Sequence, residues 1–136
     1  MASSDPWITL KRNYELSFES LADPLKELYV IREGEVIGFV LIQMIGTFKG
    51  YIQSIAIKDE YRGKGFGSRL LEFAEERIFR QSPNVFMCVS SFNEQAKKLY
   101  LQKGYSIIGE IDNFIIEGYS EILMRKTKGP LHGYNR

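Results

Sequence analysis

The chain has 136 residues, and its 18 Lys and Arg against 17 Asp and Glu leave a formal net charge of +1. This length suits one domain with a sizeable core, and a hydrophobic content of 44% excludes disorder for most of the chain. The balanced charge provides no field that would attract nucleic acid or an acidic membrane. Because Cys88 is the only cysteine and His132 the only histidine, an internal disulfide is excluded and a histidine-based metal site or catalytic triad is disfavoured.

The sequence shows no signal peptide and no apolar span long enough for a membrane helix. We therefore expect a cytoplasmic protein that does not contact membranes. A single domain is predicted over residues 1–136, with a polar tail from about residue 129.

The first half of the chain predicts a helix and three strands. Asp5-Pro6 suits the start of a helix, and Asp23-Pro24 ends it. Apolar runs separated by short turns then predict an antiparallel meander of strands at 28–31, 36–42 and 51–57. The run at 36–42 is almost entirely apolar, which favours a central strand covered on both faces.

The second half alternates helices and strands. A helix from Phe66 carries Leu70, Ala74 and Ile78 on an apolar face, with the glutamates at 72, 75 and 76 on the opposite face. A strand is predicted at 85–89. Ser91-x-x-Glu94 is a capping-box pattern for a second helix that starts between residues 91 and 93 and ends before Gly104. Two final strands are predicted at 105–111 and 121–124.

This order predicts an α+β fold with a mixed, mostly antiparallel sheet and helices on both faces. A strand, a helix and a strand in one sheet imply a parallel crossover between 51–57 and 85–89. We expect these two strands to be neighbours that splay apart at their carboxyl ends, where ligands bind in such sheets.

A glycine-rich loop joins the third strand to the next helix. Its amides lie at a helix N-terminus, its glycines admit close approach, and Arg62 and Lys64 add positive charge, which together favour an anion site. The spacing Gly63-x-Gly65-x-Gly67 fits neither a Walker loop nor a Rossmann fingerprint. A tight turn with solvated charges is the alternative.

The spacing Arg62-x-x-Gly65-x-Gly67 instead resembles the pyrophosphate-binding signature of the GNAT family, the GCN5-related N-acetyltransferases. A second segment is similar to the other hallmark of that family. Its matching positions are Asn93, Ala96, Tyr100, Gly104 and Tyr105. The resemblance covers roughly residues 28–126 and implies the acyl-CoA N-acyltransferase-like fold.

The resemblance also implies an enzyme that transfers the acetyl group of acetyl-CoA to a primary amine by direct attack, without a metal or a covalent enzyme intermediate. Backbone groups of Ile55, Ala56 and Ile57 would hold the pantetheine arm, and an amide among them would bind the oxyanion. The pyrophosphate would lie on the loop formed by Arg62, Gly63, Lys64, Gly65, Phe66, Gly67 and Ser68. Asn93 would contact the pantetheine region, and Tyr100 would protonate the departing thiolate. Alternatively, Asn93 only caps its helix and Tyr100 only packs.

The sequence departs from the family pattern in two places. Little room remains before Asp5 for the usual first strand, and the strand before the loop carries no carboxylate, which in relatives often serves as general base. The base therefore stays open among water relays and the carboxylates Glu33, Glu35, Asp112, Glu117 and Glu121.

The acceptor also stays open. The segment 113–121 is loosely similar to the final hairpin of relatives that acetylate protein N-termini, while a lysine or a small-molecule amine is equally tenable. A homodimer is left open. A non-catalytic acyl-CoA-binding regulatory module is the alternative function, and the absent strand carboxylate is consistent with it.

Overall fold

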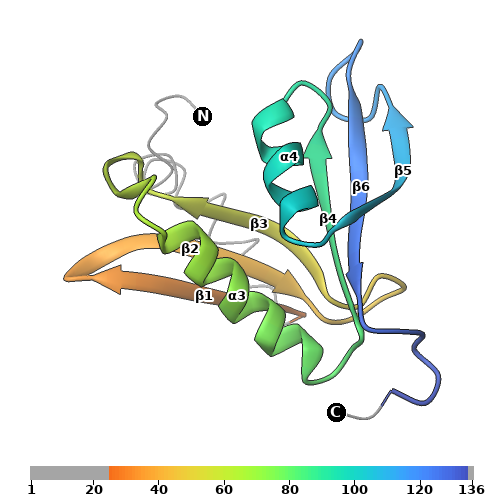
Figure 1. The fold of residues 1–136 in the computed structure, drawn as a ribbon, viewed down its shortest axis with the longest axis horizontal. Coiled ribbons are helices and arrows are strands. Elements are labelled where there is room, and N and C mark those ends of the chain that lie inside the picture. The colour runs from red at the N-terminus through yellow and green to blue at the C-terminus, as the bar shows by residue number, and fades with distance from the viewer. Residues whose placement is uncertain (1–24, 135–136) are drawn as a thin grey trace.

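The computed structural model describes residues 25–134, which form a six-stranded mixed sheet with two α-helices (Figure 1). The elements in chain order are β1 (Lys26–Glu33), β2 (Glu35–Gln43), β3 (Tyr51–Ile57), a 3₁₀ turn η1 (Asp59–Tyr61), α3 (Phe66–Phe79), β4 (Asn84–Ser90), α4 (Glu94–Gln102), β5 (Ser106–Asp112) and β6 (Ser120–Thr127). All predicted strands are present. The helix predicted between Asp5 and Asp23 lies outside the described residues, as does any strand before it.

The sheet consists of two antiparallel halves, β1-β2-β3 and β4-β6-β5, in the order β1-β2-β3-β4-β6-β5. The halves meet where β3 and β4 run parallel, and this ladder has a single register pair, Tyr51↔Phe86. One further backbone bond, from Phe86 N to Gly50 O at 2.9 Å, closes the same end. Beyond it the two strands diverge, as Figure 1 shows. The predicted parallel, splayed pair is confirmed.

Gly50 makes the close approach at this junction possible. A Cβ there would lie 2.3 Å from the carbonyl oxygen of Asn84 and 2.7 Å from Cγ2 of Ile78, and the residue has a φ of +90°. Any larger residue would therefore push β4 or α3 away from β3.

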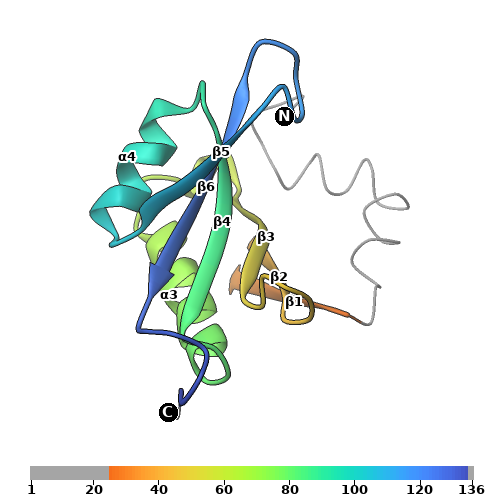
Figure 2. The same cartoon turned by 90° about the vertical axis from the view of Figure 1, so that its right-hand side faces the viewer.

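The core lies between the sheet and α3, and both described helices cover the same face of the sheet (Figure 2). Leu70, Leu71, Ala74, Ile78 and Phe79 form the buried apolar stripe of α3, which extends the predicted face by Leu71 and Phe79 on one flank. They pack against apolar side chains from the four central strands, including Val40, Ile52, Val85 and Met124. Burial of such side chains contributes about 1.5–3 kcal/mol each.

Glu75 corrects the sequence-based assignment of the outer face of this helix. Its side chain is buried and not solvated: Tyr105 donates its hydroxyl to Oε2 at 2.8 Å, and Lys126 Nζ lies 3.0 Å from Oε1. Glu75 is four residues after Leu71, so it lies on the flank of the apolar stripe. Burial there is tolerable because both carboxylate oxygens have partners from distant elements.

A β-bulge in β3 changes which side chains point into the core. The ladder with β2 pairs Ile42 with Ile52 and then Leu41 with Ser54, so Gln53 is the extra residue. An inserted residue shifts the alternation by one, and as a result Ile52, Ile55 and Ile57 all join the same core. The sequence alone did not reveal this bulge.

Candidate active site

The loop after β3 has the backbone conformation that its glycines suggested. Gly63 and Gly65 have φ values of +75° and +88°, in the left-handed region that other residues avoid. Gly65 is the residue preceding α3, and it supplies no capping side chain. The first amides of the helix therefore have no local acceptor.

Unpartnered amides define what this loop can bind. Within the described residues, none of the backbone N–H groups from 63 to 68 donates a hydrogen bond, and the first that does is Arg69 N, to Gly65 O at 3.1 Å. Consecutive free amides at a helix N-terminus bind anions, and phosphate oxygens suit them best.

The two predicted cations of the loop differ in role. Arg62 donates from Nε to the Ile57 carbonyl at 3.1 Å and pairs through Nη1 with Asp59 Oδ1 at 2.9 Å, so it fixes the end of β3 while keeping half of its side chain exposed. Lys64 lies over the Tyr61 ring, with Nζ 5.7 Å from the ring centre. Arg62 therefore shapes the loop as well as adding charge to it.

A cavity of about 590 Å³, here called the loop pocket, extends from this loop past the end of β3 to α4. Most residues predicted to bind the cofactor line it, and the two exceptions are Lys64 and Phe66, whose ring packs on Tyr61. Ala96, a position of the second family hallmark, lines it too. Sequence reasoning did not assign a binding role to three further lining residues, which are Leu71, Gln95 and Leu99.

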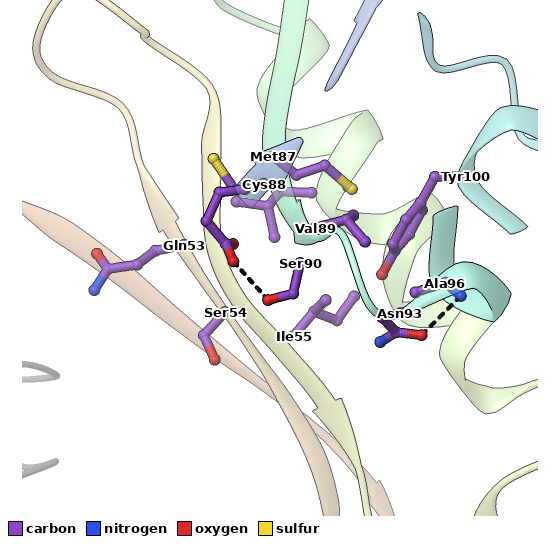
Figure 3. A pocket seen from close by; sticks show the side chains of 12 residues that line it. Gln53, Ser54, Ile55, Met87, Cys88, Val89, Ser90, Asn93, Ala96 and Tyr100 are labelled. Carbon is purple, nitrogen blue, oxygen red and sulfur yellow. Dashed lines mark hydrogen bonds between the residues drawn. The ribbon is translucent and has the colours of Figure 1, made fainter. Parts of the chain in front are cut away.

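A second cavity of about 300 Å³, here called the strand pocket, lies where β3 and β4 diverge (Figure 3). Its walls come from β3, β4, α4 and β6. Its polar side chains are Gln53, Ser54, Cys88, Ser90, Asn93, Tyr100 and Glu121. Ile55, Asn93, Ala96 and Tyr100 line both pockets, so the two cavities adjoin through the opening in the sheet.

Asn93 directly precedes α4 as its N-cap residue, and it lines both pockets. Its Oδ1 accepts from Ala96 N at 3.0 Å, so it caps the helix, and the helix start predicted from the sequence is correct to within two residues. Ser91 is not the cap; its hydroxyl accepts from Ser120 N at 3.0 Å. Capping uses only the carbonyl oxygen of the Asn93 amide, and Nδ2 remains a donor for a ligand.

Tyr100 lies on the face of α4 that looks toward the strands, with its hydroxyl directed to the side of Ile55 and Asn93 (Figure 3). Its ring meets that of Tyr105 edge-on at 5.8 Å. Burial raises the pKa of the Tyr100 hydroxyl above its ordinary value near 10. The hydroxyl has no hydrogen-bond acceptor within the described residues, so it is a protonated donor next to both pockets.

Glu121 is the single carboxylate that lines either pocket among the described residues. It accepts from the Ser90 hydroxyl at 2.6 Å across the β4–β6 ladder. Sequence analysis left it as one of five carboxylates and overlooked Ser90, because only the strand register brings the two together.

The hydroxyl of Tyr51 has its pKa raised to about 12 by burial and by hydrogen bonding to Cys88. Within the described residues no group of side chains could hold a metal ion.

Comparison with known proteins agrees with this geometry. A family model described as the acetyltransferase (GNAT) family matches residues 2–105. The chain is 33% identical over 109 residues to an uncharacterized N-acetyltransferase of Methanocaldococcus jannaschii, covering 73% of this chain and 67% of that one. It is 28% identical over 130 residues to the N-alpha-acetyltransferase RimI of Mycobacterium tuberculosis, covering 92% and 78%. The solved ribosomal-protein-S18-alanine N-acetyltransferase of Escherichia coli has the same fold, with a TM-score of 0.73 at 18% identity, covering 90% and 81%.

A splayed sheet with an amide-lined loop at its opening defines an acyltransferase of the acyl-CoA-dependent class. The chain belongs to the GNAT family and is an acetyl-CoA-dependent N-acetyltransferase. The loop pocket fits that cosubstrate, because its free amides and positive-φ glycines suit a pyrophosphate. No helix in residues 25–134 is long and apolar enough to cross a membrane.

Proposed function

We propose that the loop pocket binds acetyl-CoA and that the strand pocket binds the acceptor amine. The observation that carries this proposal is the shared wall: Ile55, Asn93, Ala96 and Tyr100 line both cavities. Two substrates entering from opposite faces of the sheet would meet there, in the opening between β3 and β4.

The binding roles follow from which groups have no partner. Amides 63–68 receive the pyrophosphate, with Arg62 beside them. β3 pairs with β4 only at Tyr51, so backbone groups of Ile55 to Ile57 on that edge are available to the pantetheine arm and to the thioester oxygen. Asn93 contributes Nδ2 from the opposite wall.

Tyr100 acts as general acid in this arrangement. The amine nitrogen forms a bond to the acetyl carbon while the bond from that carbon to sulfur breaks, and the sulfur takes the Tyr100 proton. A thiol with a pKa of about 8.5 is a better leaving group when an acid protonates it during departure. Attack is direct, so the enzyme forms no covalent intermediate.

We infer that the acceptor is the free α-amino group of a protein N-terminus in the cytoplasm. The relatives include N-alpha-acetyltransferases from Sulfurisphaera tokodaii and M. tuberculosis, which supports this substrate class. From Gly104 to Met124 the chain carries four carboxylates and no Lys or Arg. A negative surface around the strand pocket favours a cationic acceptor.

A transfer assay tests this proposal directly. The protein is mixed with acetyl-CoA and one of three acceptors: peptides with a free N-terminus, the same peptides blocked at the N-terminus with an internal lysine, or free lysine and polyamines. Released thiol gives the rate, and mass spectrometry locates the acetyl group. We expect transfer to free N-termini. Transfer to lysine or polyamines alone would overturn the acceptor class, and acetyl-CoA binding without any transfer would support a regulatory module.

A further inference from the structure

We propose that Glu121 is the general base of this enzyme, so that the proton acceptor lies on the last strand and not on the strand before the glycine-rich loop. The inference rests on the proposed function, because it assigns a role to the acceptor side of the same site. β3, the strand where relatives often carry this carboxylate, has only Gln53 and Ser54 as polar residues within the strand pocket.

Position singles out Glu121 among the carboxylates that the sequence left open. Glu35 is exposed and pairs with Lys58 at 3.3 Å, and Glu33 is exposed at the end of β1. Asp112 lines a separate cavity beside the β5–β6 hairpin, and Glu117 lies at the exposed tip of that hairpin. Glu121 alone lines the pocket that also contains Tyr100.

The strand register holds this carboxylate firmly. Ser90 and Glu121 are directly paired in a ladder of β4 with β6 that runs without a bulge from Asn84↔Thr127 to this pair. The Ser90 hydroxyl donates to Oε2 at 2.6 Å, which orients the carboxylate and leaves Oε1 to accept a hydrogen bond from the N–H of an incoming amine. A base must be positioned within hydrogen-bond reach of the proton it takes, and this contact supplies the positioning.

The groups around Glu121 leave its negative charge unpaired. Cys88 on β4 and Tyr51 on β3 face it and are neutral, because burial raises the pKa of both groups. Ile111, opposite it on β5, is apolar. Arg125, further along the same face of β6, donates to Asn84 at 2.8 Å. A cationic or polar amine entering the strand pocket is therefore the partner that this carboxylate lacks.

With Glu121 as base and Tyr100 as acid, every proton in the reaction has a donor and an acceptor. An acceptor that enters as an ammonium first loses one proton to water. The neutral amine then uses its lone pair to form the nitrogen–carbon bond, and its surplus N–H proton passes to the Glu121 carboxylate. The electron pair of the carbon–sulfur bond leaves with sulfur, which takes the Tyr100 proton. Glu121 then releases its proton to water, and Tyr100 regains one. No oxidant or further reactant is needed.

Glu121→Gln tests the role, with Glu110→Gln as a matched control. Glutamine keeps the volume and the oxygen that accepts from Ser90 but cannot take a proton. Glu110 lies on the same hairpin and likewise accepts a serine hydroxyl, that of Ser120, but it lines neither pocket. We expect Glu121→Gln to lower kcat by about 10²–10⁴, with acetyl-CoA affinity unchanged. Glu110→Gln should keep the kcat of the parent.

Several results separate the inference from the proposed function. Partial rescue by Glu121→Asp would support a base, because a carboxylate is restored. If Glu121→Gln keeps the parent kcat, or changes KM alone, Glu121 is not the base. A parent protein that binds acetyl-CoA by calorimetry but acetylates no amine would overturn the proposed function, and this inference with it.

Discussion

The loop pocket and the strand pocket adjoin, but they are built in opposite ways. The loop pocket has at one end a single continuous stretch, residues 62–68, that offers backbone amides, and its charged lining residues are Arg62 and Lys103. The strand pocket takes its lining from four elements through side chains, and its charged residue is Glu121. A site for a shared cosubstrate can thus be local and independent of side chains, while the site for a particular acceptor depends on tertiary register.

The two pockets also differ in the sign of their charge. Positive charge and free N–H groups lie where phosphates are expected, and negative charge lies where an amine is expected. Substitutions on either side should therefore affect one substrate and spare the other.

The largest effect is expected at the shared wall. Tyr100→Phe keeps the ring and its edge-on contact with Tyr105 and removes only the proton donor. We expect kcat to fall by about 10²–10⁴ while acetyl-CoA affinity, measured by calorimetry, changes little. Tyr105→Phe is the control, because it removes a buried hydroxyl bonded to Glu75 at 2.8 Å that faces neither pocket. Turnover of Tyr100→Phe at the parent rate would leave Tyr100 a packing residue.

The second effect concerns the loop. Gly65→Glu places a side chain and a negative charge at the proposed pyrophosphate site, and we expect acetyl-CoA affinity to fall about 100-fold or more. Gly118→Glu is the matched control. Gly118 has the same φ of +88° and the same open space around a Cβ, but it lies on the β5–β6 hairpin. Equal loss of affinity in both variants would show that backbone strain, and not the loop site, is responsible.

A smaller effect is expected at Asn93, which has a structural and a binding role. Asn93→Ser keeps a capping oxygen and removes the amide donor, so we expect acetyl-CoA affinity to fall about fivefold with little loss of stability. Asn93→Ala should in addition lower the free energy of unfolding by about 1 kcal/mol. Urea titration and calorimetry on the three proteins separate the two roles. An unchanged affinity in both variants would leave Asn93 as a cap only.

The smallest effect on turnover is expected at a contact that serves stability, between α3 and later residues of the chain. Glu75 on α3 joins Tyr105 and Lys126 of the opposite half of the sheet. We expect Tyr105→Phe to lower the free energy of unfolding by about 1–3 kcal/mol at pH 8, since Glu75 loses a buried donor. Turnover should change little if the contact serves stability alone.

The same residue predicts how stability depends on pH. Burial, followed by the charge of Glu75, raises the pKa of Tyr105 in the fold. The unfolded chain ionises near pH 10 while the fold does not, so stability is full below about pH 10 and falls above it. Denaturation between pH 8 and 11 should show a shallower decline for Tyr105→Phe than for the parent. Equal slopes would contradict the assignment to Tyr105.

The sequence predicted those features of the fold that are determined by residues close together in the chain. The apolar period of α3, the glycine turn and the crossover from β3 to β4 follow from periodicity and turn chemistry, and the structure confirms them. Glu75 was misplaced because its partners come from residues 105 and 126, which no helical pattern can reveal. The helix start stayed open between Ser91 and Asn93, because the contact that occupies the Ser91 hydroxyl comes from Ser120, a tertiary neighbour. The bulge at Gln53 and the contact between Ser90 and Glu121 could not be predicted either, because both depend on how the strands are aligned in the sheet.

Because the two halves of the sheet are joined near Gly50, a small change at this junction is amplified at the far end of the opening. The two halves of the sheet are fixed to each other at one end, through Tyr51 and Phe86, and are free at the other, where β3 ends at Ile57. Seven residues at about 3.3 Å each make an arm of roughly 20 Å, so a tilt of a few degrees at the fixed end moves the far end by about an ångström. Because a Cβ at Gly50 would press on Asn84 and Ile78, a single methyl group there would change the aperture in which the two substrates meet, without touching either of them.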